Sequence, residues 1–382
     1  MASRNGTAPA RSLAVLHPVF LLTGVLHAIG GPLLPSLASN LKLNDNQSGL
    51  IFLFYFGGTS IGALLCVGKY AQLMAIGFSL VAICCCAIAW VTWPLQLVVF
   101  AAMGVGVGLP MSAVTLFAGR AFPERLNPVL VLLNFTWSAG ALIAPLFAAR
   151  VLLDHTFRAA YAMLAGASIA AALMCLVWLR DPPEKQSTPS ESIRGSTLRA
   201  VALFAIAAFL QVGVENTAAS WLATYTLRTS QSGPALAAIF SGLYWTGFLA
   251  SRALSSLILL RVKAFDFLRV VLPGAFVAAL LLYAASSHSL RGVVMFLLGA
   301  TCAPIYPLIV AGSLHRVPQI AATRWVLAAA GVGGSILPWL TGWISVQSGS
   351  IRTAMLTLPA GLLALLVLLP ILLQEKSSAP KA

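Results

Sequence analysis

The sequence has few charged residues, and acidic residues are the scarcest of them. Only 8% of the 382 residues are charged, and Asp and Glu together number 9 against 23 Lys and Arg. Soluble domains carry about 25% charged residues. Here 59% of the residues are hydrophobic and the mean hydropathy is +0.93. This balance excludes a soluble globular domain and predicts a polytopic protein of the lipid bilayer.

The chain also lacks the clusters that metal sites, redox centres and enzyme active sites require. Its six cysteines all fall in apolar segments, where cysteine behaves as a small hydrophobe. The run 84–86 is no metal site, because consecutive helical residues point in different directions. The glycine-rich segments 104–110 and 331–334 follow no strand, which excludes a nucleotide-binding loop. We therefore expect no enzymatic activity, no cofactor and no metal.

What the chain does contain is a series of long apolar segments, each able to cross a bilayer with roughly 20 residues. We predict twelve spans, at 12–38, 48–68, 71–91, 94–118, 127–150, 157–179, 200–227, 234–260, 267–286, 290–314, 320–346 and 352–373. An outer-membrane barrel would instead show alternating segments of about ten residues. The predicted fold is an all-α membrane protein with twelve transmembrane helices.

The formal net charge of +14 would indicate nucleic-acid binding in a soluble protein, but here its distribution indicates topology. If the N-terminus is cytoplasmic, most basic residues lie on the inner side. The outer side keeps only Lys42, Arg150, Arg158, Arg228, Arg291 and Arg352. The positive-inside rule then predicts cytoplasmic N- and C-termini in a plasma or bacterial inner membrane. We expect no nucleic-acid partner and a monomeric protein.

One polar stretch, 180–199, divides the spans into two groups of six and reads as a cytoplasmic linker. We predict six-helix bundles at 1–179 and 200–382. Three matches at equal spacing indicate that these halves are parallel repeats. They pair Tyr55, Gly58 and Gly62 with Tyr244, Gly247 and Ser251; Gly104, Arg120 and Pro123 with Gly299, His315 and Pro318; and Gly140–Pro145 with Gly333–Pro338.

Several motifs resemble the fucose/glucose permease-type branch of the major facilitator superfamily. They lie at 31–35, 133–145, 246–252, 303–307 and 333–342, together with the Val-Gly-Val-Glu-Asn element that precedes Trp221 and Tyr225. The resemblance covers nearly the whole chain. It implies two pseudo-symmetric six-helix bundles and a secondary transporter that moves a sugar by alternating access around a midplane site.

Two features of that family are missing. The loop after the second span has only 68–72 (Gly-Lys-Tyr-Ala-Gln) in place of an Asp-Arg-x-Gly-Arg-like element. Proton-coupled fucose permeases carry one carboxylate near the position of Gly31 and another in helix four, and this chain has neither. The resemblance therefore does not extend to proton coupling.

The most informative stretch is Gln211–Tyr225, because it places Glu215 inside an apolar span. A carboxylate at membrane depth costs several kcal/mol and normally faces a bundle interior or a watery path. Gln211 lies four residues earlier, on the same helical face, and Asn216 could reach the same cavity. We predict that all three bind solute and that Glu215 is the candidate for coupling a proton or sodium ion. The structural alternative makes Glu215 a partner of a buried Arg or of an interrupted helix.

Other candidate substrate-binding residues lie in four further spans. His27 sits mid-helix in the first span, where its imidazole could bind a hydroxyl or, if protonated, pair with Glu215. Asn134 and Trp137 are three residues apart in the fifth span. Tyr244 and Tyr306 fall deep in the eighth and tenth spans, which favours a cavity over the interfacial aromatic belt.

We therefore expect a secondary transporter, working as a symporter or uniporter, for a small polar solute, with a monosaccharide favoured. Sugars suit a site with few charges, several amides and hydroxyls, and aromatic walls. One alternative is an exporter of amphipathic compounds, or an organic-anion carrier using Arg252 or Arg324. Another is a non-transporting receptor or a lipid scramblase on the same fold.

Overall fold

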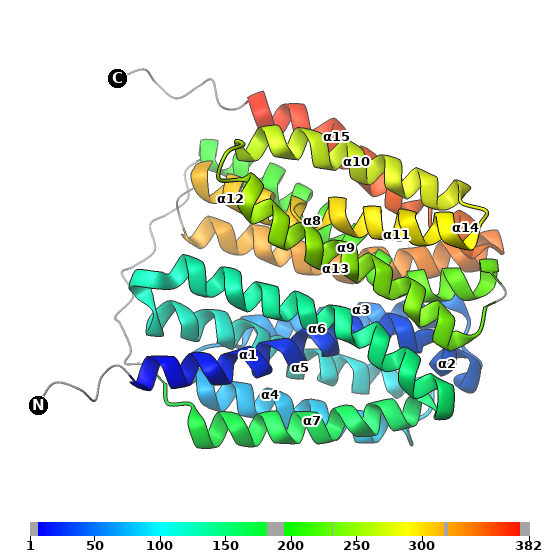
Figure 1. Ribbon diagram of the computed structural model, residues 1–382, viewed down its shortest axis with the longest axis horizontal. Helices are drawn as coiled ribbons and strands as arrows, with labels where there is room; N and C mark the ends of the chain where they lie inside the picture. The colour runs from blue at the N-terminus through cyan, green and yellow to red at the C-terminus, as the bar shows by residue number, and fades with distance from the viewer. Residues whose placement is uncertain (1–6, 182–194, 231, 317–319, 375–382) are drawn as a thin grey trace, which may run out of the picture. The chain divides into compact units, whose positions relative to one another are not determined.

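The computed structural model describes residues 7–181, 195–230, 232–316 and 320–374, which are helical apart from short connections (Figure 1). In the first part of the chain the helices are α1 (Thr7–Ala28), α2 (Gly30–Leu41), α3 (Asp45–Leu64), α4 (Tyr70–Ile88), α5 (Gln96–Ala121), the 3-10 turn η1 (Pro123–Arg125), α6 (Leu126–Asp154) and α7 (Phe157–Trp178). The second part contains α8 (Gly195–Ser230), α9 (Pro234–Ile258), α10 (Ala264–Ala284), α11 (His288–Cys302), α12 (Ile305–Arg316), α13 (Ile320–Ser348), α14 (Ile351–Ala354) and α15 (Thr357–Gln374).

The predicted membrane spans are confirmed. Within the described ranges, eleven helical segments are long and apolar enough to cross a membrane, and the bent pair α1–α2 makes a twelfth span. The segments coincide with the twelve predicted spans to within several residues at their ends. The all-α fold follows from the sequence because each apolar run can satisfy its backbone in lipid only as a helix.

Two spans are interrupted at prolines. The first bends by 43° between α1 and α2, where Ile29 separates the helices and Pro32 follows. The tenth breaks between α11, which ends at Cys302, and α12, which begins at Ile305 after Pro304. A proline has no N–H for the carbonyl four residues earlier and its ring crowds that carbonyl, so the helix bends.

The described helices divide into two compact units. The first comprises 1–187 and 222–242, and the second comprises 188–221 and 243–382. Residues 222–242, which the sequence assigns to the second half, are thus grouped with the first unit. The predicted bundles at 1–179 and 200–382 remain a prediction, and residues 182–194 of the predicted linker lie outside the described residues.

Close helix crossings in the first unit depend on glycine. A Cβ atom on Gly104 of α5 would lie 2.0 Å from the carbonyl oxygen of Tyr55 in α3, and one on Gly58 would lie 2.2 Å from that of Ala101. Small residues allow membrane helices to approach at backbone distance. The close packing of α3 against α5 therefore depends on Gly58 and Gly104, which both belong to the predicted sequence repeat.

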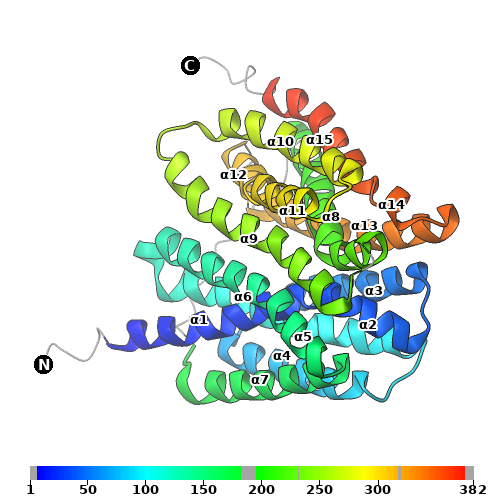
Figure 2. The ribbon, with the colours of Figure 1, turned by 45° about the vertical axis from the view of Figure 1, so that its right-hand side comes forward.

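The second unit repeats these crossings with the residues that the sequence spacing paired. A Cβ on Gly299 of α11 would lie 1.9 Å from the carbonyl oxygen of Tyr244 in α9, and one on Gly247 would lie 2.0 Å from that of Phe296. Tyr244, Gly247 and Gly299 thus occupy the contacts of Tyr55, Gly58 and Gly104. In the same unit α10 packs beside α11 and α15, as both Figure 1 and Figure 2 show. The predicted repeat is confirmed at these crossings.

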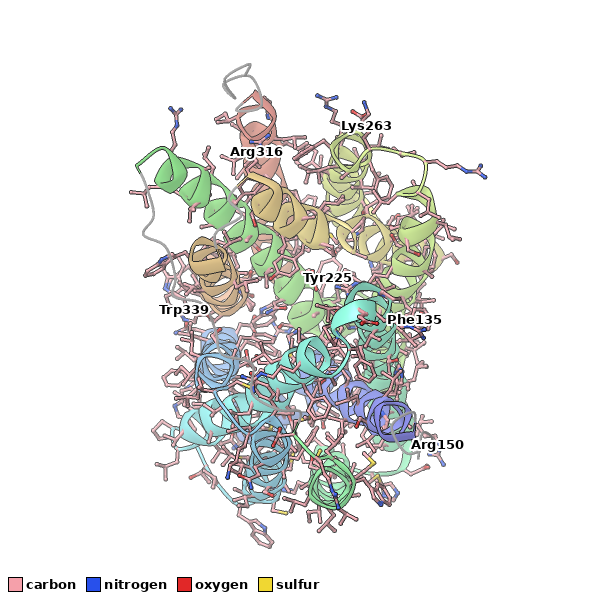
Figure 3. All side chains as sticks on the ribbon, turned by 90° about the vertical axis from the view of Figure 1, so that its left-hand side faces the viewer. Phe135, Arg150, Tyr225, Lys263, Arg316 and Trp339 are labelled. Carbon is pink, nitrogen blue, oxygen red and sulfur yellow. The ribbon has the colours of Figure 1, made fainter. Side chains whose placement is uncertain are left out.

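The ends of the fourth span in each repeat also correspond. The Arg120 guanidinium, at the end of α5, lies 4.6 Å from the ring centroid of Tyr70, which begins α4. That of Arg316, at the end of α12 and labelled in Figure 3, lies 5.5 Å from the ring of Phe265 in the first turn of α10. Arg316 thus makes the contact equivalent to that of Arg120. The sequence spacing paired Arg120 with His315, which lies one residue before Arg316. The side chains of His315 and Pro318 lie outside those described.

Candidate functional site

The candidate site in the second unit is built on the middle of α8. Gln211, Glu215 and Asn216 are all buried, at 0%, 8% and 5% exposure. They lie among apolar and small residues of α8, which also carries buried hydroxyls such as those of Thr217 and Ser220. Their buried placement agrees with the expectation that polar groups at membrane depth face protein rather than lipid.

Asn216 has a structural partner. Its amide Nδ2 donates to the carbonyl oxygen of Gly334 in α13 at 3.1 Å. That carbonyl would ordinarily accept from the N–H four residues later, but Pro338 stands there and has none. Asn216 therefore replaces a hydrogen bond that Pro338 removes from α13. Its predicted role in solute binding stays a prediction.

Gln211 forms a hydrogen bond at the break between α11 and α12. Its Nε2 donates to the carbonyl oxygen of Cys302, the last residue of α11, at 3.1 Å. The last carbonyls of a helix lack intrahelical partners, so this bond satisfies one of them. The side-chain oxygen Oε1 of Gln211 is buried and has no hydrogen-bond partner among the described residues. The Nε2 group of Gln211 thus forms a structural hydrogen bond, whereas its Oε1 atom can still accept a hydrogen bond from a donor.

Unlike Gln211 and Asn216, which bond backbone carbonyls, Glu215 interacts with other side chains. Its carboxylate lies within electrostatic range of the Arg252 guanidinium and of the hydroxyls of Tyr244 and Tyr306. Arg252 in turn lies over the ring of Phe248, 4.7 Å from its centroid. The hydroxyl of Tyr244 is buried and bonds no described residue. The structure thus brings together four of the predicted residues, namely Gln211, Glu215, Tyr244 and Tyr306.

Arg252 is a residue of this cluster that the sequence analysis considered only for an organic anion. It lies inside α9, six residues before the helix ends at Ile258. A signal was present, because Arg252 falls within the predicted span 234–260. An arginine there needs an acidic or polar partner. The nearness of Glu215 agrees with the structural alternative of a buried arginine partner, and it is equally compatible with a site.

In the first unit His27 lies in an aromatic setting. Its ring centroid is 5.2 Å from that of Phe56 and 5.2 Å from that of Trp137. The hydroxyl of Tyr55 donates to the neighbouring carbonyl of Leu26 at 2.8 Å. The structure therefore brings His27 and Trp137 together, with aromatic rings beside the imidazole.

His27 and Glu215 occupy equivalent positions of the repeat. A Cβ on Gly140 would lie 2.0 Å from the carbonyl oxygen of Leu21, and one on its repeat partner Gly333 would lie 2.0 Å from that of Phe209. Six residues after Leu21 stands His27, and six after Phe209 stands Glu215. Each unit thus carries an ionisable side chain at the same point of its first helix.

Asn134 is placed differently from its predicted partner. It is exposed on α6, and its Nδ2 donates to the carbonyl of Leu130 in the same helix at 2.8 Å. Trp137, three residues later, is buried at 6% exposure. The structure therefore does not bring Asn134 into the His27 cluster, although three-residue spacing places it on a neighbouring helical face.

The bond between Asn216 and Gly334 gives a testable prediction. We expect Asn216→Ala to lower the free energy of unfolding by about 1–3 kcal/mol, because the Gly334 carbonyl loses its donor. In a Pro338→Ala background the new N–H can bond that carbonyl, so the cost should fall markedly. A double-mutant cycle on thermal unfolding in detergent measures this difference. Equal costs in both backgrounds would contradict the proposed compensation.

Comparisons with known proteins place this arrangement among transporters. Residues 16–324 match the family described as Major Facilitator Superfamily. A glucose/galactose transporter of Brucella abortus (strain 2308) is 26% identical over 371 residues, covering 88% of each chain. This agrees with the resemblance to the fucose/glucose permease-type branch.

Solved structures agree on the fold. The fucose:proton symporter FucP of E. coli is 19% identical, with a TM-score of 0.65 over 96% of this chain and 99% of that one. A bacterial homologue of the human lysosomal transporter Spinster, in an inward-facing and unoccupied conformation, is 14% identical, with a TM-score of 0.72 over 96% of both chains. At these identities the likeness concerns the fold alone.

Proposed function

The chain belongs to the major facilitator superfamily of membrane transporters, and from that premise we propose that it is a secondary transporter of a monosaccharide, working by alternating access. Relatives that transport solutes agree with the expectation of no enzymatic activity. We further propose that both termini are cytoplasmic, in a plasma or inner membrane, and that the chain acts as a monomer.

The observation that carries this proposal is the polar cluster on α8, α9 and α12 of the second unit. Gln211 offers a buried acceptor oxygen and Tyr244 a buried hydroxyl, and neither of these atoms bonds a described residue. Glu215 adds a strong acceptor and Arg252 compensates its charge. A sugar presents hydroxyls that donate and accept in fixed directions, together with an apolar ring face. The cluster supplies matching groups with little net charge.

The similarity to a glucose/galactose transporter over 88% of each chain supports the choice of solute. His27 and Trp137 of the first unit are the residues we propose for the ring face, because aromatic rings pack against apolar sugar surfaces. Ion coupling, by proton or sodium, is proposed at Glu215, the acidic residue that lies at membrane depth in α8.

A second candidate solute is an organic anion. Arg252 lies inside α9, and a guanidinium is well suited to binding a carboxylate in two-pronged fashion. In that case the anion would compete with Glu215 for Arg252. The side chain of Arg324, the other arginine of this hypothesis, lies outside those described. Glu215 already balances Arg252 electrostatically, so a neutral solute is favoured.

Transport in proteoliposomes tests the proposal. Purified protein is reconstituted, and uptake of labelled D-glucose, D-galactose and L-fucose is measured with and without proton or sodium gradients. We expect saturable uptake of at least one hexose that unlabelled hexose inhibits, while labelled organic anions and lipophilic cations are not taken up. Empty liposomes give the background rate. Uptake of the anions alone would replace the sugar proposal with the second candidate, and movement of lipid probes alone would favour a scramblase.

A further inference from the structure

The first unit contains a cavity that the proposed transport site does not use. It has a volume of about 410 Å³, lies where α2 ends and α3 begins, and is bordered on α8 by Thr224, Leu227 and Arg228. All of its lining residues belong to the unit formed by 1–187 and 222–242. Sites for small ligands in proteins range from about 300 to 1,000 Å³, so this cavity has the size of a small-molecule site.

One wall of the cavity is held in place by an ion pair. The two guanidinium nitrogens Nη1 and Nη2 of Arg228 donate to the carboxylate oxygens of Asp45 at 2.6 and 2.5 Å. Asp45 is only 8% exposed, and it begins α3 directly after Asn44, whose side chain accepts from the N–H of Gln47. A two-pronged pair of this kind fixes both side chains. The ion pair therefore holds this wall in one arrangement in the structure.

Two residues that line the same cavity carry hydroxyls with unused hydrogen-bonding capacity. Ser48 of α3 is 1% exposed and Thr224 of α8 is 3% exposed. The oxygen atoms of both side chains are buried and bond no described residue. A buried hydroxyl without a partner carries a desolvation penalty, so such groups bind water or a ligand. Two of them from different helices on one cavity define a place for polar atoms.

We propose that this cavity is a second binding site for a polyhydroxylated solute of monosaccharide size, which rests on the proposed sugar transport. Ser48 and Thr224 bind hydroxyls of the solute, and the wall of Asp45 and Arg228 adds charged partners at the rim. Leu34 and Pro35, which also line the cavity, contact the apolar ring face.

Hydrogen–deuterium exchange of the full-length protein, titrated with D-glucose and D-galactose, tests the proposal. We expect hexose to slow exchange in peptides covering 34–48. The Ser48→Ala/Thr224→Val variant should weaken the apparent affinity of this protection about tenfold, because two hydrogen bonds are lost. Thr226→Val is the matched control, since Thr226 is equally buried on α8 with an unbonded hydroxyl but does not line the cavity.

Glu215→Gln separates this site from the transport cluster. We expect it to retain the protection of 34–48 while gradient-driven accumulation of solute is lost. If hexoses are transported but 34–48 shows no protection, or the double variant and Thr226→Val behave alike, the cavity holds only water and the inference is wrong. If neither protection nor hexose uptake occurs in the unaltered protein, the proposed sugar function itself fails. Thermal unfolding checks that each variant is folded.

Discussion

We expect Glu215→Gln to abolish gradient-driven accumulation of solute and to spare exchange of labelled for unlabelled solute across the membrane. Gln keeps the shape and hydrogen-bonding capacity of the side chain but cannot carry the charge that couples an ion. Loss of one partner of a buried charge pair also leaves Arg252 uncompensated, which in buried pairs costs about 3–5 kcal/mol. Proteoliposome accumulation and counterflow assays measure the two activities separately.

Two further variants control for indirect effects of this change. Ser220→Ala alters a buried hydroxyl on the same helix, at 1% exposure, and should leave accumulation unchanged. Glu215→Gln/Arg252→Gln removes both charges and should recover much of any stability lost in the single variant. If uptake, solute binding and pH dependence are all unchanged in Glu215→Gln, the assignment of Glu215 is wrong. Loss of both accumulation and exchange would make Glu215 a solute-binding residue instead.

Gly104→Ala and Gly299→Ala are expected to destabilise the protein strongly and to similar degrees. The added methyl groups would lie 2.0 and 1.9 Å from the carbonyl oxygens of Tyr55 and Tyr244, which are backbone atoms that cannot rotate away. The helices must separate, and overpacking of this kind typically costs about 1–3 kcal/mol and occasionally more. We expect lower yields of folded protein and a melting temperature several degrees lower in each variant.

Glycines without close neighbours provide the control for helix propensity. A Cβ on Gly57 of α3 or Gly166 of α7 would meet no atom within 4 Å. Gly57→Ala and Gly166→Ala should therefore leave the melting temperature unchanged or raise it, since Ala is the better helix former. A similar loss in all four variants would show that the close crossings are not the cause. A loss in Gly104→Ala alone would contradict the equivalence of the two repeats.

The repeat also gives a physical reason for treating His27 and Glu215 together. His27 lies six residues after Leu21, whose carbonyl is in close contact with Gly140. Glu215 lies six residues after Phe209, whose carbonyl is in close contact with the equivalent glycine, Gly333. Their surroundings differ, because His27 lies between aromatic rings and Glu215 lies near a guanidinium and two phenols. The same position of the repeat thus carries aromatic contacts in one unit and charge in the other.

The sequence by itself determined the class, the helices and the repeat. Hydropathy and segment length are local properties, and a backbone in lipid has few alternatives to the helix, so all twelve spans could be predicted. The equal spacing of glycine and proline residues revealed the repeat, because small residues such as Gly permit backbone contact where two helices cross. Glu215 was identified in the same way, as an ionisable residue in an apolar run.

Only the tertiary structure decided which polar groups remain open to a solute. Asn216 and Gln211 looked equivalent to Glu215 in the sequence, yet they donate to carbonyls 118 and 91 residues away. Packing also brings Arg252 near Glu215, and it pairs Asp45 with Arg228 across 183 residues. Such pairings depend on how helices cross and rotate, which hydropathy and spacing do not encode.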